Sequence, residues 1–415
     1  MLDNIKIAEY IYDKRKRKGL TQQQVADELN VSYQAVSKWE NGTTYPSIDI
    51  LYELACLLDV TIDEIVKARD AKERGLTYSE SGVDISYSNS IKNEMSDYIN
   101  SENERVLNGL GPFASLYDIK FDDIRYPVLV LKSEEPGSKQ KLAMKYGYTE
   151  SICHDMINHL VNDIVVMGAK PLAVLDTIIC GGAEKDTIKS LIKGMSEACK
   201  ENECDLVGGE TSIQPNVVDK GVYILSSSVT GIVDKDKVID GAKIKGGDKI
   251  LAVASNGLHT NGYSLVRMLI DKTPNILRDK IDNETLLETI MKPHTPYYKL
   301  IKPLFNKDCI NGMAHITGGG IEGNLSRIIP KSLSAKVDLS KINVLPVFRY
   351  IKERGNVDDD EMLRTFNCGV GFIIVVDKNI ANKIIDTVSK SVDCYEIGDI
   401  VSGDCSVELI NDLNW

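Results

Sequence analysis

The sequence predicts a small all-α domain at the N-terminus, followed by a larger α/β module. Three observations support this fold class. At 415 residues the chain is too long for one hydrophobic core, so two or three domains are expected. Residues 4–66 have apolar residues at helical spacing, separated by helix-capping signals. Later in the chain, short apolar runs such as Tyr126–Leu131 indicate strands among further helical segments.

The bulk composition is that of a globular protein, with 43% hydrophobic and 27% charged residues. No apolar run approaches the roughly 20 residues that span a bilayer. The N-terminus also lacks the charge-then-apolar order of a signal peptide. We therefore expect a cytoplasmic protein without a membrane partner. The net charge of −12 does not suggest nucleic-acid binding by overall electrostatics. However, residues 14–18 are all basic and could contact phosphates, unless they form an ordinary solvated helix end.

The nine cysteines are scattered and form no Cys-x-x-Cys pair. A zinc cage or a disulfide framework is therefore not expected. Cys153, His154 and His159 lie close together in the sequence and could bind a metal. We favour the simpler interpretation, a buried cysteine beside surface histidines.

Residues 4–66 are expected to form five short helices. Thr21 and Gln24 have the spacing of a capping box, and Asn30 and Val31 form a turn before a helix capped by Ser32. Two short helices joined by a tight turn are typical of a helix-turn-helix. The first helix should bury the apolar residues that stand at helical spacing, namely Ile5, Ile7, Ala8, Ile11 and Tyr12.

The string VSYQAVSKWENGTTYPS (31–47) resembles the helix-turn-helix domains of the lambda-repressor and Cro type. This resemblance implies a DNA partner, with the third helix in the major groove. Gln34 can bond adenine through two hydrogen bonds, and Lys38 can reach guanine or phosphate. The alternative is a protein-interaction module that kept the fold. The expected DNA-contacting residues are Gln22, Ser32, Tyr33, Gln34, Ser37 and Lys38.

Four strings mark the rest of the chain: GGET (208–211), SNGLHTNGYSLVR (255–267), HITGGG (315–320) and EMLRTFNCGVG (361–371). Together they resemble aminoimidazole ribonucleotide synthase, also called phosphoribosylformylglycinamidine cyclo-ligase, which closes the imidazole ring of purines with ATP. The resemblance implies two α/β halves and a homodimer formed by the N-terminal halves. The expected domains are 1–69 for DNA binding, 70–76 as linker, 77–238 for ATP, metal and dimerisation, and 239–415 as the second half.

The loop at 134–139 departs from this family, which carries Asp-Gly-Val-Gly-Thr-Lys there. Glu134 keeps the negative charge, Ser138 keeps the hydroxyl and Lys139 keeps the cation. Glu135 and Pro136 do not replace the family's glycine and valine, because a carboxylate repels phosphates and proline removes a backbone donor. The loop is either a variant metal site or a damaged one.

The remaining nucleotide-binding positions of the family are retained. Oxygen donors of this kind suit Mg²⁺ bridging phosphates, so the resemblance implies ATP and Mg²⁺ as cofactors. With Glu134, Ser138 and Lys139, the expected nucleotide and metal residues are Asp155, Asn162, Asp163, Asp176 and Glu210.

Three glycine-containing segments are expected to contact the substrate. Glycine permits close approach of the backbone to a ligand, and a helix N-terminus favours phosphate. Within these segments His259 is the candidate for proton transfer, alongside Lys139 as the second catalytic residue, although a lone histidine can also be structural. The expected substrate-binding residues are Gly208, Gly209, Thr211, Asn261, Gly262, Thr317, Gly318 and Gly319.

Two functions follow from the resemblance. The first is an ATP-dependent cyclo-ligase of purine biosynthesis joined to a sequence-specific DNA-binding domain. The second is a transcription regulator whose altered synthase-like domain senses a purine intermediate or a nucleotide. Retention of Lys139 and the downstream acids favours the first, while the altered loop is what a sensor could look like. Both interpretations share the same partners: DNA, a nucleotide, a purine intermediate and a second copy of the chain.

Overall fold

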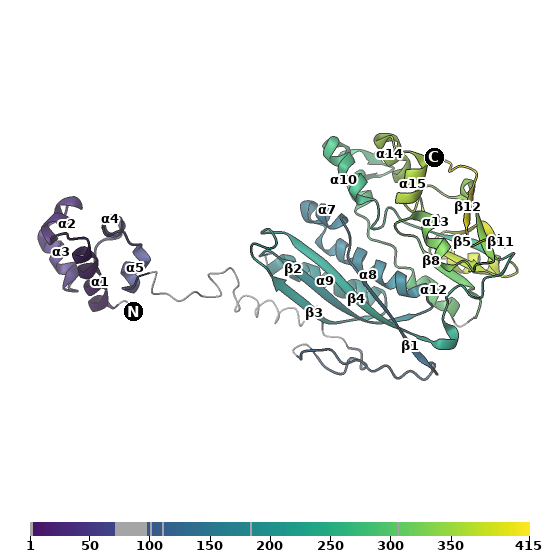
Figure 1. Cartoon of the computed structure of the whole chain (residues 1–415), viewed down its shortest axis with the longest axis horizontal. Coiled ribbons are helices and arrows are strands. Elements are labelled where there is room, and N and C mark those ends of the chain that lie inside the picture. Colours follow the sequence, from purple (N-terminus) through teal and green to yellow (C-terminus); the bar gives the residue numbers. More distant parts are fainter. Residues whose placement is uncertain (1–2, 71–97, 100–101, 110–111, 183–184, 306) are drawn as a thin grey trace. The chain divides into compact units, whose positions relative to one another are not determined.

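The computed structural model describes residues 3–70, 98–99, 102–109, 112–182, 185–305 and 307–415 (Figure 1). The chain separates into two compact units, Met1–Ser81 and Gly82–Trp415. Residues 71–76 of the expected linker and the expected start of the synthase-like module at Thr77 lie outside the described residues. The predicted domain boundaries therefore stay predictions.

The smaller unit is the predicted all-α domain. Its helices are α1 (Asn4–Arg17), α2 (Gln22–Glu28), α3 (Tyr33–Glu40), α4 (Ile48–Leu58) and α5 (Ile62–Lys67). The capping box predicted at Thr21 and Gln24 is present, and the Ser32 hydroxyl accepts a hydrogen bond from the Ala35 amide. The sequence-based prediction of five short helices is confirmed.

The buried stripe of α1 is narrower than predicted. Ile7, Ala8 and Ile11 are buried, but Ile5 and Tyr12 are 69% and 43% exposed. Ile5 lies two residues before Ile7, about 200° around the helix axis, so both cannot face one small core. The expectation for Ile5 and Tyr12 was wrong because helical spacing alone allowed too wide an apolar face.

The first half of the larger unit has a four-stranded sheet in the order β1-β4-β2-β3. Helices α8 and α9 lie side by side and pack against the sheet (Figure 1). The bounds are β1 (Pro127–Glu134), α7 (Lys139–Tyr146), α8 (Thr149–Val165), β2 (Lys170–Cys180), α9 (Lys185–Glu201), β3 (Asp205–Ile213) and β4 (Tyr223–Asp234).

The second half is built on a six-stranded sheet in the order β12-β9-β11-β5-β10-β8. Strand β10 (Val370–Val376), which lies between β5 and β8, is buried at every position. Other elements used below are β5 (Lys249–Ala254), α10 (Tyr263–Lys272), β8 (Gly312–His315) and α13 (Gly320–Leu325). The remaining helices and strands are α11 (Leu286–Ile290), α12 (Tyr298–Phe305), α14 (Pro346–Gly355), α15 (Asp359–Thr365), α16 (Ala381–Val388), β6 (Lys280–Ile281), β7 (Glu284–Thr285), β9 (Leu333–Asp338), β11 (Cys394–Ser402) and β12 (Val407–Ile410).

The GGET string (208–211) lies inside β3 and not in a loop. Leu206 pairs with Val174 and Gly208 with Leu175, so Val207 is an extra residue and forms a bulge. Gly208 has a φ of 151°, which a side chain would disfavour. The glycine therefore shapes the strand itself, a role that the string alone did not reveal.

Candidate functional site

Helix α3 exposes the residues that were predicted to read DNA. Tyr33 is 47% exposed, and Gln34 and Lys38 are exposed as well. Val36 and Trp39 are buried on the opposite side and hold the helix to the core. Of the other expected contacts, Ser32 caps the helix, and Ser37 is half-buried. One face of α3 is therefore exposed and accessible to a DNA groove.

Gln22 has a partner within the domain. Its side-chain amide donates a 2.8 Å hydrogen bond to Glu40, whose carboxylate also receives two bonds from Arg15, at 2.5 and 2.7 Å. Arg15 is buried, so this member of the basic run 14–18 stabilises the fold instead of facing phosphates. Lys14 and Arg17 pair with Asp70. The sequence showed a cationic run, but only the fold shows which charges are already neutralised.

Replacing either Gln34 or Lys38 with alanine should weaken specific DNA binding. Loss of a bidentate base contact costs about 1–3 kcal/mol of discrimination, whereas loss of a phosphate contact weakens all sequences alike. Both side chains are exposed, so the fold should be retained. Fluorescence anisotropy at fixed salt, with selected and scrambled duplexes, measures both effects. Gln23→Ala, an exposed position on α2, serves as the control; wild-type affinity and preference in both α3 variants would refute this DNA-binding face.

In the larger unit, the two predicted substrate loops of the second half, 255–267 and 315–320, converge with the 361–371 segment. The Asn367 side chain accepts from the Ser255 hydroxyl and donates to the Gly257 carbonyl, each at 2.9 Å. The Gly319 amide donates to the Arg364 carbonyl at 3.0 Å. A Cβ on Gly318 would lie 3.4 Å from the Asn261 side chain, which places these two loops in contact.

Glycine is required where these loops pass closest to one another. A Cβ on Gly262 would lie 2.1 Å from the Phe366 ring, and one on Gly320 would lie 1.8 Å from the Leu363 carbonyl oxygen. Gly262 is also the N-cap of α10, with a φ of 79°. The Thr317 hydroxyl donates to the side-chain oxygen of Asn324, near the end of α13. Gly208, Gly209 and Thr211 instead lie on β3 in the first half.

Four of the five histidines form one cluster between the halves. His259 stacks on His294 with ring centroids 3.8 Å apart, and His294 Nε2 lies 2.9 Å from His315 Nε2. His159 lies beside both His294 and His315. Burial, the nearby His315 and Lys139, and the other imidazoles hold the pKa of His259 well below its usual range. His259 is therefore neutral, and its Nδ1 has no hydrogen-bond partner among the described residues.

Lys139 does not have the surroundings expected of a phosphate-binding lysine. Its side chain and that of Asp155 are both fully buried, with Nζ 2.7 Å from Asp155 Oδ2. Nζ also donates to the Lys292 carbonyl at 2.6 Å, and the His294 amide donates to Asp155. Burial raises the pKa of Asp155 to about 6, opposed by Lys139. These two predicted site residues bind each other.

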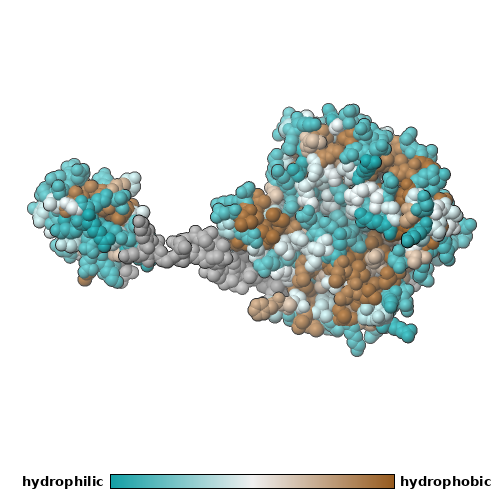
Figure 2. All heavy atoms as spheres, in the orientation of Figure 1, coloured by the Kyte–Doolittle hydropathy of each residue, from teal (hydrophilic) through white to brown (hydrophobic). Residues whose placement is uncertain are grey.

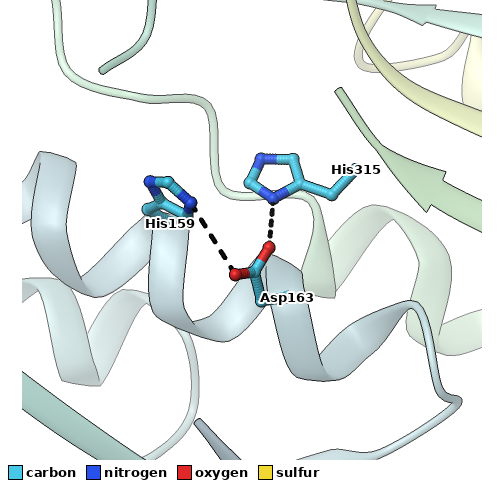
Figure 3. A group of neighbouring side chains, drawn as sticks. All are labelled: His159, Asp163 and His315. Carbon is cyan, nitrogen blue, oxygen red and sulfur yellow. Dashed lines mark hydrogen bonds and ion pairs between the residues drawn. The ribbon is translucent and has the colours of Figure 1, made fainter. Parts of the chain in front are cut away.

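Asp163 is the centre of a second group of charges. His315 Nδ1 lies 2.7 Å from one of its oxygens, and Lys132 Nζ lies 3.0 Å from the other. Lys132 also contacts Glu134 at 2.9 Å. His159 Nε2 faces the carboxylates of Asp163 and Glu134 at 3.7 and 3.8 Å. Figure 3 shows His159 and Asp163 projecting from one helix toward His315.

The protonation of this group follows from its surroundings. Burial, together with the neighbouring His315, lowers the pKa of His159 to about 4. Burial alone would raise the pKa of Asp163, but the hydrogen bond and charge of His315 bring it below its usual range. At neutral pH the group therefore presents a neutral His159 imidazole and an ionised Asp163 carboxylate.

Asp176 lies apart from both groups, on β2. It is buried, and neither of its carboxylate oxygens has a hydrogen-bond partner among the described residues. Its register partner on β4 is Ser227, whose hydroxyl also lacks a partner there. Burial, together with the charge of Glu210, raises the pKa of Asp176 to about 7. Asp176 and Ser227 are therefore neighbouring buried residues whose side-chain oxygens lack hydrogen-bond partners in the described part of the chain. Buried polar groups in proteins nearly always have such partners, so these two point to a ligand or ion.

The structure thus divides the predicted nucleotide residues among several places. The side chain of Asn162 already has partners within the fold. Its Nδ2 donates to the Thr295 carbonyl, and its Oδ1 accepts from the Tyr297 amide. Ser138 is half-buried and lies 3.4 Å from the Ser264 hydroxyl. Glu210 is exposed on β3. Two strands, β4 and β2, lie between β3 and the strand β1 that carries Glu134.

Several residues of the site were not predicted. Lys132, Ser227, His294 and His315 come from separate strands and loops, and no local spacing connects them. His159 was expected to be a surface histidine beside the buried Cys153, but it is buried, so this expectation was wrong. The usable signal was the i, i+4 spacing of His159 and Asp163, which places both on one face of a helix. His154 points elsewhere and contacts Glu201.

Comparison with known proteins agrees with this architecture. Residues 11–65 match the helix-turn-helix family, 129–233 match the N-terminal domain of AIR synthase related proteins and 245–410 match their C-terminal domain. Phosphoribosylformylglycinamidine cyclo-ligase from Acetivibrio thermocellus is 38% identical over 337 residues, which cover 80% of this chain and 99% of that protein. The chain belongs to the phosphoribosylformylglycinamidine cyclo-ligase family. The chloroplastic/mitochondrial relative from Vigna unguiculata is 37% identical over 80% of this chain and 82% of its own length.

Solved structures support the fold of this cyclo-ligase family member. Escherichia coli HypE matches with a TM-score of 0.58 and 17% identity, covering 78% of this chain and 94% of that one. Thiamine-monophosphate kinase from Stenotrophomonas maltophilia matches with a TM-score of 0.57 and 17% identity, covering 80% and 97%. Among the described residues, no helix has both the length and the apolarity needed to cross a membrane.

Proposed function

We propose that this chain is an ATP-dependent cyclo-ligase of purine biosynthesis coupled to a sequence-specific DNA-binding domain. Two observations support this proposal. The family resemblance spans nearly the whole of its cyclo-ligase relative, and the two predicted substrate loops of the second half meet the 361–371 segment beside a buried histidine cluster. A further HypE structure, with a TM-score of 0.57, is described as a complex with ATP. ATP use is therefore in keeping with the fold.

The chemistry proposed for the site follows the family reaction. ATP phosphorylates the formyl amide oxygen of phosphoribosylformylglycinamidine and leaves as ADP. The amidine nitrogen then attacks the activated carbon, and the ring closes as the phosphorylated oxygen leaves as inorganic phosphate. A proton must leave that nitrogen. The predicted acceptor is His259, whose neutral imidazole has an Nδ1 without a hydrogen-bond partner among the described residues. The predicted substrate glycines would let the backbone approach the ligand.

Mg²⁺ would be held by Asp176, with Ser227 beside it, because these buried oxygens lack partners among the described residues. When bound, the ion would neutralise negative charge on the ATP phosphates. Glu134 and Asp155 were also expected among the nucleotide and metal residues. Asp155 is already neutralised by Lys139, and Glu134 lies in the separate group of charges around Asp163.

A turnover assay with phosphoribosylformylglycinamidine, ATP and Mg²⁺ tests the proposal directly. The wild-type protein should release ADP, inorganic phosphate and aminoimidazole ribonucleotide. His259→Ala should lower kcat by about 10²–10⁴-fold, which is the usual contribution of a general acid or base. His154→Ala, on the surface of α8, should turn over like the wild type. No product from folded, ATP-binding wild-type protein would refute the enzymatic function.

A sensor is the second candidate, and the buried Lys139–Asp155 pair favours it. A lysine held at 0% exposure cannot contact a phosphate unless the pair opens. In this case the wild-type protein would bind ATP or the purine intermediate without turnover. DNA affinity would change when the ligand binds, and ligand affinity would change by the same factor on DNA.

Dimerisation is proposed through the outer face of the first sheet. Large apolar side chains on β1, β2 and β4 are exposed there: Leu129, Leu131, Leu175 and Ile224, at 47%, 68%, 46% and 41%. Figure 2 shows apolar atoms gathered on the larger unit. Exposed apolar faces of this kind are typical of subunit contacts. A dimer would carry two recognition helices for half-sites about 34 Å apart, or a multiple of that distance.

A further inference from the structure

One group of metal-ligating side chains has no role in the reaction steps described above, although Asp163 and Glu134 were expected among the nucleotide and metal residues. Ligand atoms of His159, Asp163 and His315 all lie within 4.8 Å of one another. Around a tetrahedral zinc ion such atoms are about 3.4 Å apart, so a modest contraction would complete the first three positions. Glu134 Oε2, 3.8 Å from His159 Nε2, is available as a fourth oxygen ligand.

The other nitrogens of the two imidazoles are already occupied. His159 Nδ1 lies 2.9 Å from the Thr260 hydroxyl, and His315 Nε2 lies 2.9 Å from His294 Nε2. These contacts leave His159 Nε2 and His315 Nδ1 facing Asp163 (Figure 3). Metal-bound histidines are usually oriented in this way by a partner on the second nitrogen. The arrangement is therefore more than three residues that happen to be close.

In the described structure, the ammonium group of Lys132 lies between the two carboxylates that would bind a metal ion. Its Nζ lies 2.9 Å from Glu134 Oε2 and 3.0 Å from Asp163 Oδ2. The lysine side chain is 36% exposed, whereas the His315 side chain is 3% exposed. Lys132 can therefore swing into solvent and leave two carboxylates and two imidazoles around one point. The ammonium group of Lys132 would therefore compete with a metal ion for these carboxylates.

We propose that His159, Asp163, His315 and Glu134 form a binding site for a divalent d-block ion of the zinc class. Imidazole with carboxylate suits Zn²⁺, Co²⁺ and Ni²⁺, whereas Mg²⁺ prefers oxygen ligands alone. His159 and Asp163 come from α8 in the first half, and His315 ends β8 in the second. A bound ion would link the two halves of the larger unit beside the glycine loops.

The experiment uses full-length protein stripped with EDTA, without ATP or substrate. Calorimetry with Zn²⁺, and Co²⁺ titration followed by its visible absorption, should show one equivalent per chain. His159→Ala and His315→Ala should each weaken binding by about tenfold or more, because even supporting residues contribute that much. His154→Ala, on the same helix but outside the group, should bind like the wild type.

Lys132→Met is the decisive variant, since it removes the competing cation and leaves all four ligands in place. It should bind Zn²⁺ at least threefold more tightly than the wild type. Millimolar Mg²⁺ should not displace the Co²⁺ spectrum. Circular dichroism checks that each variant is folded. The proposal is overturned if wild-type protein and Lys132→Met bind no Zn²⁺ or Co²⁺, or if the spectrum is unchanged in folded His159→Ala and His315→Ala.

Discussion

Replacing Lys139 with methionine should lower the free energy of unfolding of the larger unit by about 3–5 kcal/mol. Methionine keeps most of the side-chain volume, so the loss arises from charge and not from a cavity. Asp155 would remain fully buried as an unpaired carboxylate. The carbonyl of Lys292 would also lose its lysine donor. Urea denaturation followed by circular dichroism measures the change.

Two further variants separate this explanation from a general effect of losing a lysine. Lys141→Met changes an exposed residue on the same helix and should alter stability by less than about 0.5 kcal/mol. The double variant Lys139→Met/Asp155→Leu removes both charges and should recover most of the stability, because apolar replacement of a buried pair is often neutral. A Lys139→Met protein as stable as Lys141→Met would contradict a charged, buried pair.

Local sequence patterns predicted the parts of the fold that depend on local physics. Capping at Thr21 and Ser32, and the strand at Tyr126–Leu131, depend on residues within one or two turns or on a single apolar run. The exposure of Gln34 and Lys38 followed from the same helical periodicity. Such features can be read from one sequence because their partners are neighbours in the chain.

Long-range pairing was beyond these patterns. Lys139 and Asp155 were both assigned to the nucleotide, yet they neutralise each other. His159 was compared with its sequence neighbours, although its partners lie on a loop and on a strand more than a hundred residues away. The resemblance gave the correct family, but it could not show which retained charges still lack a partner. That question depends on tertiary contacts alone.

Replacing Asp176 with asparagine should stabilise the Mg²⁺-free protein, and the gain should depend on pH. The pKa of this carboxyl is about 7 in the folded protein, against 3.8 for an aspartate in an unfolded chain. Below about pH 4 the Asp176 carboxyl is protonated in both the folded and the unfolded state, so its ionisation does not change the free energy of unfolding. As pH rises from about 4 to 7, only the unfolded chain ionises, so folding loses about 1.4 kcal/mol per pH unit. Above pH 7 the loss is constant, on the order of 4 kcal/mol.

Asp176→Asn should therefore unfold at a higher urea concentration than the wild type at pH 8, with a clearly smaller difference at pH 5. Saturating Mg²⁺ should stabilise the wild type at pH 8 and leave Asp176→Asn unchanged, because the ion's carboxylate ligand is gone. Asp186→Asn changes an exposed residue at the start of α9 and should show neither effect. Equal stability gains for Asp176→Asn at pH 5 and pH 8 would mean that the pKa of Asp176 in the folded protein is not raised into this pH range. A Mg²⁺ response retained by the variant would place the ion on other residues.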